Sequence, residues 1–133
     1  MIWSEGNDRR RGVTVILGGL EGNETWEWNG TNWTLRTFDG EIPTPRWSDL
    51  AYDSSRGVCV LAAGEYSNRW GDWWRTDTWE YDWNEWQRRS NDQPGLYTTM
   101  ALNYVPPLGM TVLSGKHVSK IDTTPLWDGE RWH

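Results

Sequence analysis

The segment from residue 65 to residue 77 carries a group of side chains suited to ligand recognition. It contains three tryptophans, a tyrosine and two arginines: Tyr66, Arg69, Trp70, Trp73, Trp74 and Arg75. Tryptophan offers a flat apolar face and one N–H donor, which suit sugar rings and peptide side chains. Arginine adds a planar fork that can hold a carboxylate through two hydrogen bonds. The segment therefore predicts a recognition surface. The alternative is structural, with Trp73 and Trp74 folding back over the molecule's edge or packing on a neighbouring loop.

Other residue types give little support for catalysis. The two histidines, His117 and His133, are too few for a His-rich metal site. Serines are present, but the sequence suggests no set of nucleophile, base and orienting group. A calcium loop of the form D-x-D-x-D-G is also missing from the sequence. We therefore predict no catalytic residues, no metal site and no cofactor.

Composition and charge narrow the classes of partner. The chain has 133 residues, which fits one domain, and a formal net charge of −6. Phosphates require a basic surface, so this charge argues against nucleic acid and against an anionic membrane surface. Hydrophobic residues make up only 36% of the chain, and 13 residues are Trp. The core must therefore be built from a few large aromatic side chains.

The cysteine and the N-terminal residues bear on the compartment. Cys59 is the single cysteine, so no intramolecular disulfide can form, and its apolar surroundings "GVCVLAA" predict a small buried residue. The first residues, "MIWSEGNDRRRG", contain no apolar stretch typical of a signal peptide. No apolar run approaches the ~20 residues that span a membrane. The sequence does not predict a particular compartment.

One sequence unit is repeated three times along the chain. Its clearest mark is an aromatic residue, four intervening residues and then a tryptophan, in "TWEWNGTNW" (25–33), "TWEYDWNEW" (78–86) and "TPLWDGERW" (124–132). Upstream of each copy stands an apolar block: "RGVTVILGG" (11–19), "RGVCVLAAG" (56–64) and "LGMTVLSG" (108–115). Further upstream stand "MIWS", "DLAYD" and "TTMALNY". A period of this size indicates a repeat array, a propeller or a solenoid.

Each unit reads as four short strands. The runs "VTVIL", "VCVLA" and "MTVLS" are typical of buried strands, and "TWEW" and "TWEY" alternate between the two faces of a strand. The pairs Asn29-Gly30 and Asp128-Gly129 are strong signals for two-residue hairpins, whereas the second unit has the less favourable "DWNE". No segment has helical periodicity. Four antiparallel strands, repeated, predict the blades of a β-propeller.

These motifs resemble the bacterial kelch-type β-propeller, a family that includes the central domain of galactose oxidase. The resemblance is carried by the glycine doublet Gly18-Gly19, reduced to Ala63-Gly64 and Ser114-Gly115 in the later units, by the three aromatic–Trp pairs, and by Pro45-Arg46. It covers nearly the whole chain. It implies that the aromatics, Trp86 among them, fill the space between neighbouring blades. It does not extend to the copper site of galactose oxidase, whose ligands this sequence does not match.

The number of units raises the question of ring closure. We expect blades over residues 1–38, 46–90 and 96–133, within a single domain. Closed rings contain four to eight blades, so three would leave two apolar faces uncovered. Two copies joined face to face would complete a six-bladed ring, and this homodimer is the favoured expectation. The alternative is that the chain is a fragment of a larger propeller.

The same architecture predicts which residues share a face. Connections alternate between the two faces of the disc, so the 65–77 segment should lie beside the linker containing Arg46 and Trp47 and beside the segment containing Lys116 and His117. Kelch-type repeats use the arginine of the linker structurally, so a structural role weighs more for Arg46. Together these segments could form a locally basic rim.

The favoured function is therefore non-catalytic. We expect a binding scaffold that presents Trp- and Arg-rich loops on one propeller face to a protein or glycan ligand. The alternative is a glycan-active hydrolase or lyase that uses carboxylates near the central channel. Carboxylates do occur in segments typical of turns, namely Asp39, Glu41, Asp72, Asp77 and Asp82. Turn formation explains them more simply.

Overall fold

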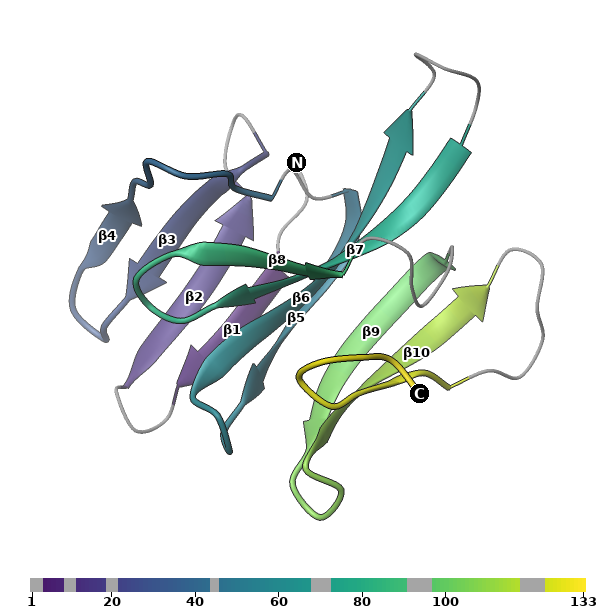
Figure 1. Ribbon diagram of the computed structural model, residues 1–133. Helices are drawn as coiled ribbons and strands as arrows, with labels where there is room; N and C mark the ends of the chain where they lie inside the picture. The colour runs from purple at the N-terminus through teal and green to yellow at the C-terminus, as the bar shows by residue number, and fades with distance from the viewer. Residues whose placement is uncertain are drawn as a thin grey trace.

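The computed structural model is built from β-strands (Figure 1). It describes residues 4–8, 12–18, 22–43, 46–67, 73–90, 97–117 and 124–133. The strands form three antiparallel sheets, and no helix occurs within these ranges. The prediction of an all-β chain is confirmed, and every sheet is made from one copy of the sequence repeat.

The strands of each sheet follow one another in chain order. The first sheet contains β1 (Ser4–Asp8), β2 (Val13–Gly18), β3 (Glu24–Trp28) and β4 (Trp33–Arg36). The second contains β5 (Arg46–Asp53), β6 (Val58–Ser67), β7 (Trp73–Tyr81) and β8 (Trp86–Ser90). The third contains β9 (Tyr97–Val105), β10 (Met110–His117) and β11 (Leu126–Trp127). A single bridge from Trp127 to Trp132 stands where the other sheets have a fourth strand.

We call Trp33, Trp86 and Trp132, which end the three copies of the aromatic motif, the repeat tryptophans. The turn before each of them is closed in the same way in all three sheets. One side-chain oxygen, on Asn29, Asp82 or Asp128, accepts hydrogen bonds from the amides two and three residues later, at 2.7–2.9 Å. This is the local chemistry that makes Asn and Asp common turn residues. Hairpin turns do form at Asn29-Gly30 and Asp128-Gly129, but four residues, not the predicted two, separate the paired Trp28 and Trp33 and the paired Trp127 and Trp132. The "DWNE" turn has the same hydrogen bonds.

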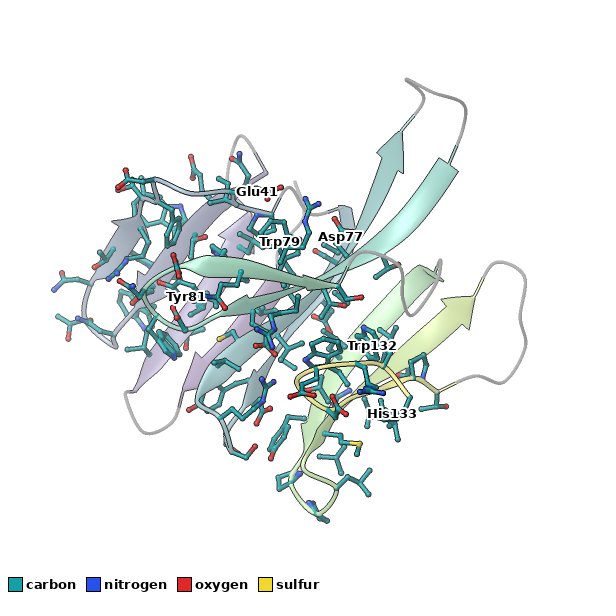
Figure 2. All side chains as sticks on the ribbon, viewed as in Figure 1. Glu41, Asp77, Trp79, Tyr81, Trp132 and His133 are labelled. Atoms are coloured by element: carbon teal, nitrogen blue, oxygen red, sulfur yellow. The ribbon has the colours of Figure 1, made fainter. Side chains whose placement is uncertain are left out.

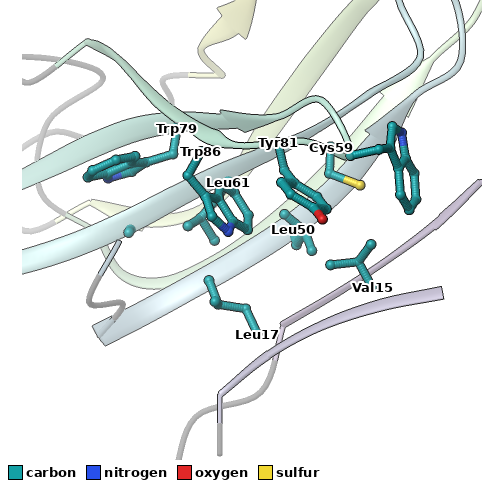
Figure 3. Close-up of a cluster of buried hydrophobic side chains, with 10 residues drawn as sticks. Val15, Leu17, Leu50, Cys59, Leu61, Trp79, Tyr81 and Trp86 are labelled. Carbon is teal, nitrogen blue, oxygen red and sulfur yellow. The ribbon is translucent and has the colours of Figure 1, made fainter. Parts of the chain in front are cut away.

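The main core lies between the first and second sheets (Figure 3). Val15 and Leu17 from β2 pack against Tyr81 and Trp86 of the second sheet, and all four are almost completely buried. Cys59 lies in the same cluster as a buried free thiol, as its sequence predicted. A smaller core between the second and third sheets contains the buried residues Ala51, Ala62, Leu102 and Leu113.

Strand alternation gives every sheet two different faces. We call the face that packs on the next sheet along the chain the forward face, and the opposite face the backward face. On the first sheet the forward face carries Val15, Leu17, Thr25 and Glu27, which the register places in opposed pairs. On the second sheet, Tyr81 and Trp86 belong to the backward face. The sequence "TWEW" thus sends Thr and Glu forward and the aromatics backward.

The repeat tryptophans join neighbouring sheets through the same hydrogen bond. Trp86 Nε1 donates to Thr25 Oγ1 of the first sheet at 2.9 Å. At the next junction, Trp132 Nε1 donates to Thr78 Oγ1 of the second sheet at 2.8 Å. Thr25 and Thr78 open the "TWE" motif of their units. The prediction that Trp86 lies between two repeat units is confirmed.

A second contact is also repeated across the two junctions. The Tyr81 hydroxyl donates to Glu27 Oε2 at 2.9 Å, and Trp127 Nε1 donates to Glu80 Oε1 at 2.9 Å. Tyr81 and Trp127 occupy the aromatic position of their units, and Glu27 and Glu80 occupy the glutamate position of the preceding ones. Each buried aromatic donor therefore meets a carboxylate acceptor, which avoids the cost of an unsatisfied polar group.

A third contact uses arginine. Arg36 Nη2 donates to the backbone oxygen of Trp83 at 3.2 Å, and Arg89 Nη2 donates to that of Gly129 at 3.0 Å. Both arginines stand three residues after a repeat tryptophan. The two junctions are therefore copies of one another, with three corresponding hydrogen bonds each.

At the second junction a partly exposed arginine binds two buried carboxylates. Arg56 binds Asp53 at 2.8 Å and Glu80 at 2.7 Å. Burial alone would lower the pKa of Arg56, but its hydrogen bonds to Glu80 and Asp53 outweigh that effect and raise it. A Cβ on Gly129, whose φ is +102°, would lie 2.8 Å from the Arg56 guanidinium. Glycine is therefore favoured here by the positive φ of its turn, and it also leaves room for the Arg56 guanidinium.

The first strands of the three sheets lie side by side. β5 neighbours both β1 and β9. Asp49 of β5 accepts a hydrogen bond from the backbone amide of Leu102 in β9, at 2.7 Å. This contact ties the second and third sheets together at their first strands.

Candidate functional site

The hairpin of β6 and β7 is longer than its neighbours in the second sheet. Pairing with β5 ends at Arg46 and Gly64, and pairing with β8 ends at Thr78 and Ser90. Thr76 and Asp77 pair with Gly64 and Ala63, which also pair with β5. Above this base the described residues of β6 and β7 pair only with each other and form a two-stranded ribbon (Figure 1, top). We call residues 65–67 and 73–77 the ribbon.

The ribbon contains most of the segment that the sequence suggested was a loop. Tyr66 stands opposite Trp74, Ser67 opposite Trp73, and Glu65 opposite Arg75. The expectation of a loop is therefore wrong for these residues. Aromatic residues favour extended strands, and both an aromatic pair and an oppositely charged pair at facing positions stabilise a ladder. Arg69 and Trp70 lie outside the described residues.

The register separates the two neighbouring tryptophans. Successive residues of a strand belong to opposite faces, so Trp74 and Tyr66 share the face of Thr78, which is the forward face of this sheet. Trp73 and Arg75 share the face of Trp79, which is the backward face. The predicted recognition residues thus form two groups rather than one continuous surface.

The remaining predicted residues lie at strand ends near the ribbon. Arg46 and Trp47 begin β5, and Lys116 and His117 end β10. Figure 1 shows the ribbon, the start of β9 and the end of β10 at the same end of the molecule. For all of these residues the structure describes the backbone position only, so their binding role stays a prediction.

The base of the ribbon is held firmly. Thr76 and Asp77 are buried. Arg88 lies 3.7 Å from Asp77, forms a 2.7 Å ion pair with Glu41, and lies over the Trp79 ring at 4.9 Å from its centroid. Figure 2 labels these three partners, Asp77, Glu41 and Trp79. The sequence did not single out Arg88, because its partners are distant in the chain. This anchoring fixes the direction in which the ribbon leaves the sheet.

Several of the described carboxylates have a structural role, because they bind nearby amides, hydroxyls or cationic side chains. Asp53 accepts hydrogen bonds from the amide and hydroxyl of Ser55 and from the amide and guanidinium of Arg56, and Asp82 closes its turn. Asp128 binds His133 at 2.6 Å, and that contact, helped by the amides of Arg131 and Glu130, lowers the pKa of Asp128. These contacts explain Asp82 as the turn residue that its sequence predicted.

The described residues contain neither a cluster of metal ligands nor a helix that could span a membrane. No three His, Cys, Asp or Glu residues among them gather closely enough to hold a metal ion. Within the same ranges no helix has the length and hydropathy needed to cross a membrane.

Comparison of the sequence with protein-family models and with curated proteins finds no match.

Proposed function

We propose that the three sheets are blades of a kelch-type β-propeller and that the protein is a non-catalytic recognition scaffold. Its ligand, a glycan or a protein, binds at the ribbon and at the strand ends beside it. The arrangement of the sheets supports the blade assignment. The strands of each sheet follow chain order, the first strands are neighbours, and both junctions use the same contacts.

The observation that carries the recognition role is the register of the ribbon. Tyr66 stands directly opposite Trp74, on a two-stranded element that extends past its sheet. A ribbon with only two strands adds little to stability by itself. Cross-strand pairing accounts for only part of what two large aromatics at facing positions can contribute, and Tyr and Trp are among the residue types enriched at binding hot spots.

The anchored base supports the same role. A recognition element needs a fixed direction, because ordering a mobile loop on binding reduces affinity. The buried Asp77 and the contacts of Arg88 hold the ribbon where it leaves the sheet. The nearby positions of Arg46, Trp47, Lys116 and His117 could add polar contacts around the aromatic pair.

The test compares the two faces of the ribbon. The double variant Tyr66→Ala/Trp74→Ala should lose binding, and Trp73→Ala serves as the matched control from the other face. The probes are a glycan array and a peptide library, followed by calorimetry with the best hit. Each hot-spot aromatic contributes roughly 2 kcal/mol or more, which is a loss of about 30-fold per residue.

Stability and turnover are measured on the same samples. The double variant should melt within a few degrees of the parent, since the ribbon lies beyond the cores. A large fall in melting temperature would show that Tyr66 and Trp74 pack structurally, and the recognition role would lose its main support. Turnover in a broad glycosidase screen would favour the glycan-active enzyme instead.

A further inference from the structure

Equivalent positions of the three sheets differ in exposure. Trp86 on the backward face of the second sheet is only 5% exposed, and Trp132 at the same repeat position on the third is half-buried, because each packs on the preceding sheet. Trp33 occupies the same repeat position as Trp86, on the first sheet, and is 49% exposed. On the same face Leu35 is 44% exposed. Among the described residues the first sheet has no sheet behind it.

The exposed face is already arranged like the covered ones. The rings of Trp28 and Trp33 are 5.1 Å apart, compared with 4.9 Å for Tyr81 and Trp86 and 5.4 Å for Trp127 and Trp132. The aromatic pair of the first sheet therefore has the geometry used at both junctions, although no described residue covers it. Exposed apolar faces of this kind are a mark of interaction surfaces.

The complementary surface is the forward face of the third sheet. Thr124 occupies the position of Thr25 and Thr78, and it is exposed. Leu126 occupies the position of Glu27 and Glu80, and it is half-buried, facing Val112 across the ladder. A threonine hydroxyl that can accept the hydrogen bond of a repeat tryptophan is thus present on this face. The carboxylate is replaced by an apolar side chain.

We propose that the backward face of the first sheet binds the forward face of the third sheet of a second copy of this chain. Trp33 Nε1 would donate to the hydroxyl of Thr124 of the partner subunit, as Trp86 does to Thr25. The ring of Trp28 would pack on Leu126 of the partner subunit.

Head-to-tail contact explains why the two open faces differ. A contact between two copies of the same face would place the Trp28 and Trp33 rings against each other and would not reproduce the tryptophan–threonine hydrogen bond of the two junctions. Joining unlike faces gives Trp33 an acceptor. When the rotation closes, such contacts form a ring, and two copies supply six sheets, within the four to eight known for propellers. The proposal uses the blade arrangement but not the ligand of the ribbon.

The experiment measures solution mass and dissociation constant by sedimentation at micromolar concentration. The parent chain should sediment at about twice its 15.6 kDa. Leu35→Arg places a charge in the proposed junction, and the Kd for association should rise by roughly 30-fold or more. Leu108→Arg is the matched control, because Leu108 is 55% exposed but lies in the turn between β9 and β10. It should leave the mass unchanged.

A third variant decides between unlike and like faces. Leu126→Arg changes only the forward face of the third sheet, so it should dissociate the head-to-tail pair and leave a back-to-back pair intact. Thr124→Arg repeats the test at an exposed position if Leu126→Arg melts early.

A monomeric parent chain would overturn the proposal while leaving ribbon binding open to its own test. An equal effect of Leu35→Arg and Leu108→Arg, or a dimer that survives both third-sheet variants, would also overturn it.

Discussion

At the scale of single residues, Trp83 holds a backbone conformation that the other two units assign to glycine. Its φ is +76°, compared with +94° for Gly30 and +102° for Gly129. A side chain in this region costs about 1–2 kcal/mol. The indole offsets that cost, because it is buried, donates to the backbone oxygen of Gly57 at 2.9 Å, and packs edge-on against Tyr52.

Substitution of Trp83 should therefore reverse the usual order of glycine and alanine. Both Trp83→Ala and Trp83→Gly lose the indole, and each should lower the free energy of unfolding by about 3–5 kcal/mol. Only glycine relieves the backbone, so Trp83→Gly should be more stable than Trp83→Ala by about 1 kcal/mol. Urea unfolding of the two variants measures the difference. If Trp83→Ala were as stable as Trp83→Gly, the turn of the alanine variant would have moved out of the positive-φ region.

Tyr81 couples one junction to pH. Burial raises the pKa of its phenol above the ordinary value of about 10, and the hydrogen bond to Glu27 raises it further. A group whose pKa is raised on folding stabilises the protein fully below its unfolded pKa. That contribution is lost as the pH rises from there towards the folded pKa.

The expected result is a loss of stability confined to alkaline solution. Between pH 8 and pH 11 the unfolding free energy of the parent should fall more steeply than that of Tyr81→Phe, with the divergence beginning near the unfolded pKa of about 10. Comparing the two proteins cancels the titration of the other tyrosines and the lysines. Parallel curves would show that Tyr81 titrates normally and that its bond to Glu27 contributes little.

At the scale of elements, short local signals predicted the turns well and the ribbon poorly. Asn29, Asp82 and Asp128 close their turns with amides two and three residues away, so a few neighbouring letters contain the whole interaction. The ribbon depends on the pairing of Tyr66 with Trp74 across a connection. The repeat frame offers no counterpart for these residues in the other units, so the sequence suggested a loop.

The anchoring of the ribbon shows the same limit. Arg88 contacts Asp77 and Glu41, which lie in other elements. Nothing in the sequence around Arg88 distinguishes it from a surface arginine, because the pairing depends on how strands from distant segments meet. The alternation of "TWEW" predicted that the two faces of the strand differ. Which neighbouring sheet packs on each face is known only from the packing of whole units.

At the scale of the whole molecule, repetition was the strongest predictor. Three copies of one unit predicted three sheets and placed the aromatics between them, and the two junctions agree in Trp86 with Thr25 and Trp132 with Thr78. The donor and acceptor of each junction stand in different units, more than 50 residues apart. The repeat therefore indicated that units stack, whereas the partner atoms required the three-dimensional structure.

The same repeat position should differ in energy according to what covers it. Trp86 is buried between sheets and donates to Thr25, so Trp86→Ala should lower the unfolding free energy by about 3–5 kcal/mol. Trp33 is half exposed within one chain, so in a monomeric background Trp33→Ala should cost below about 1 kcal/mol. Leu35→Arg is expected to make the chain monomeric, so Trp86→Ala and Trp33→Ala are each combined with it. Denaturant unfolding of the two double variants then measures only the contacts inside one chain. Equal losses would mean that Trp33 is packed within its own chain. The backward face of the first sheet would then be closed, and no second copy could bind there.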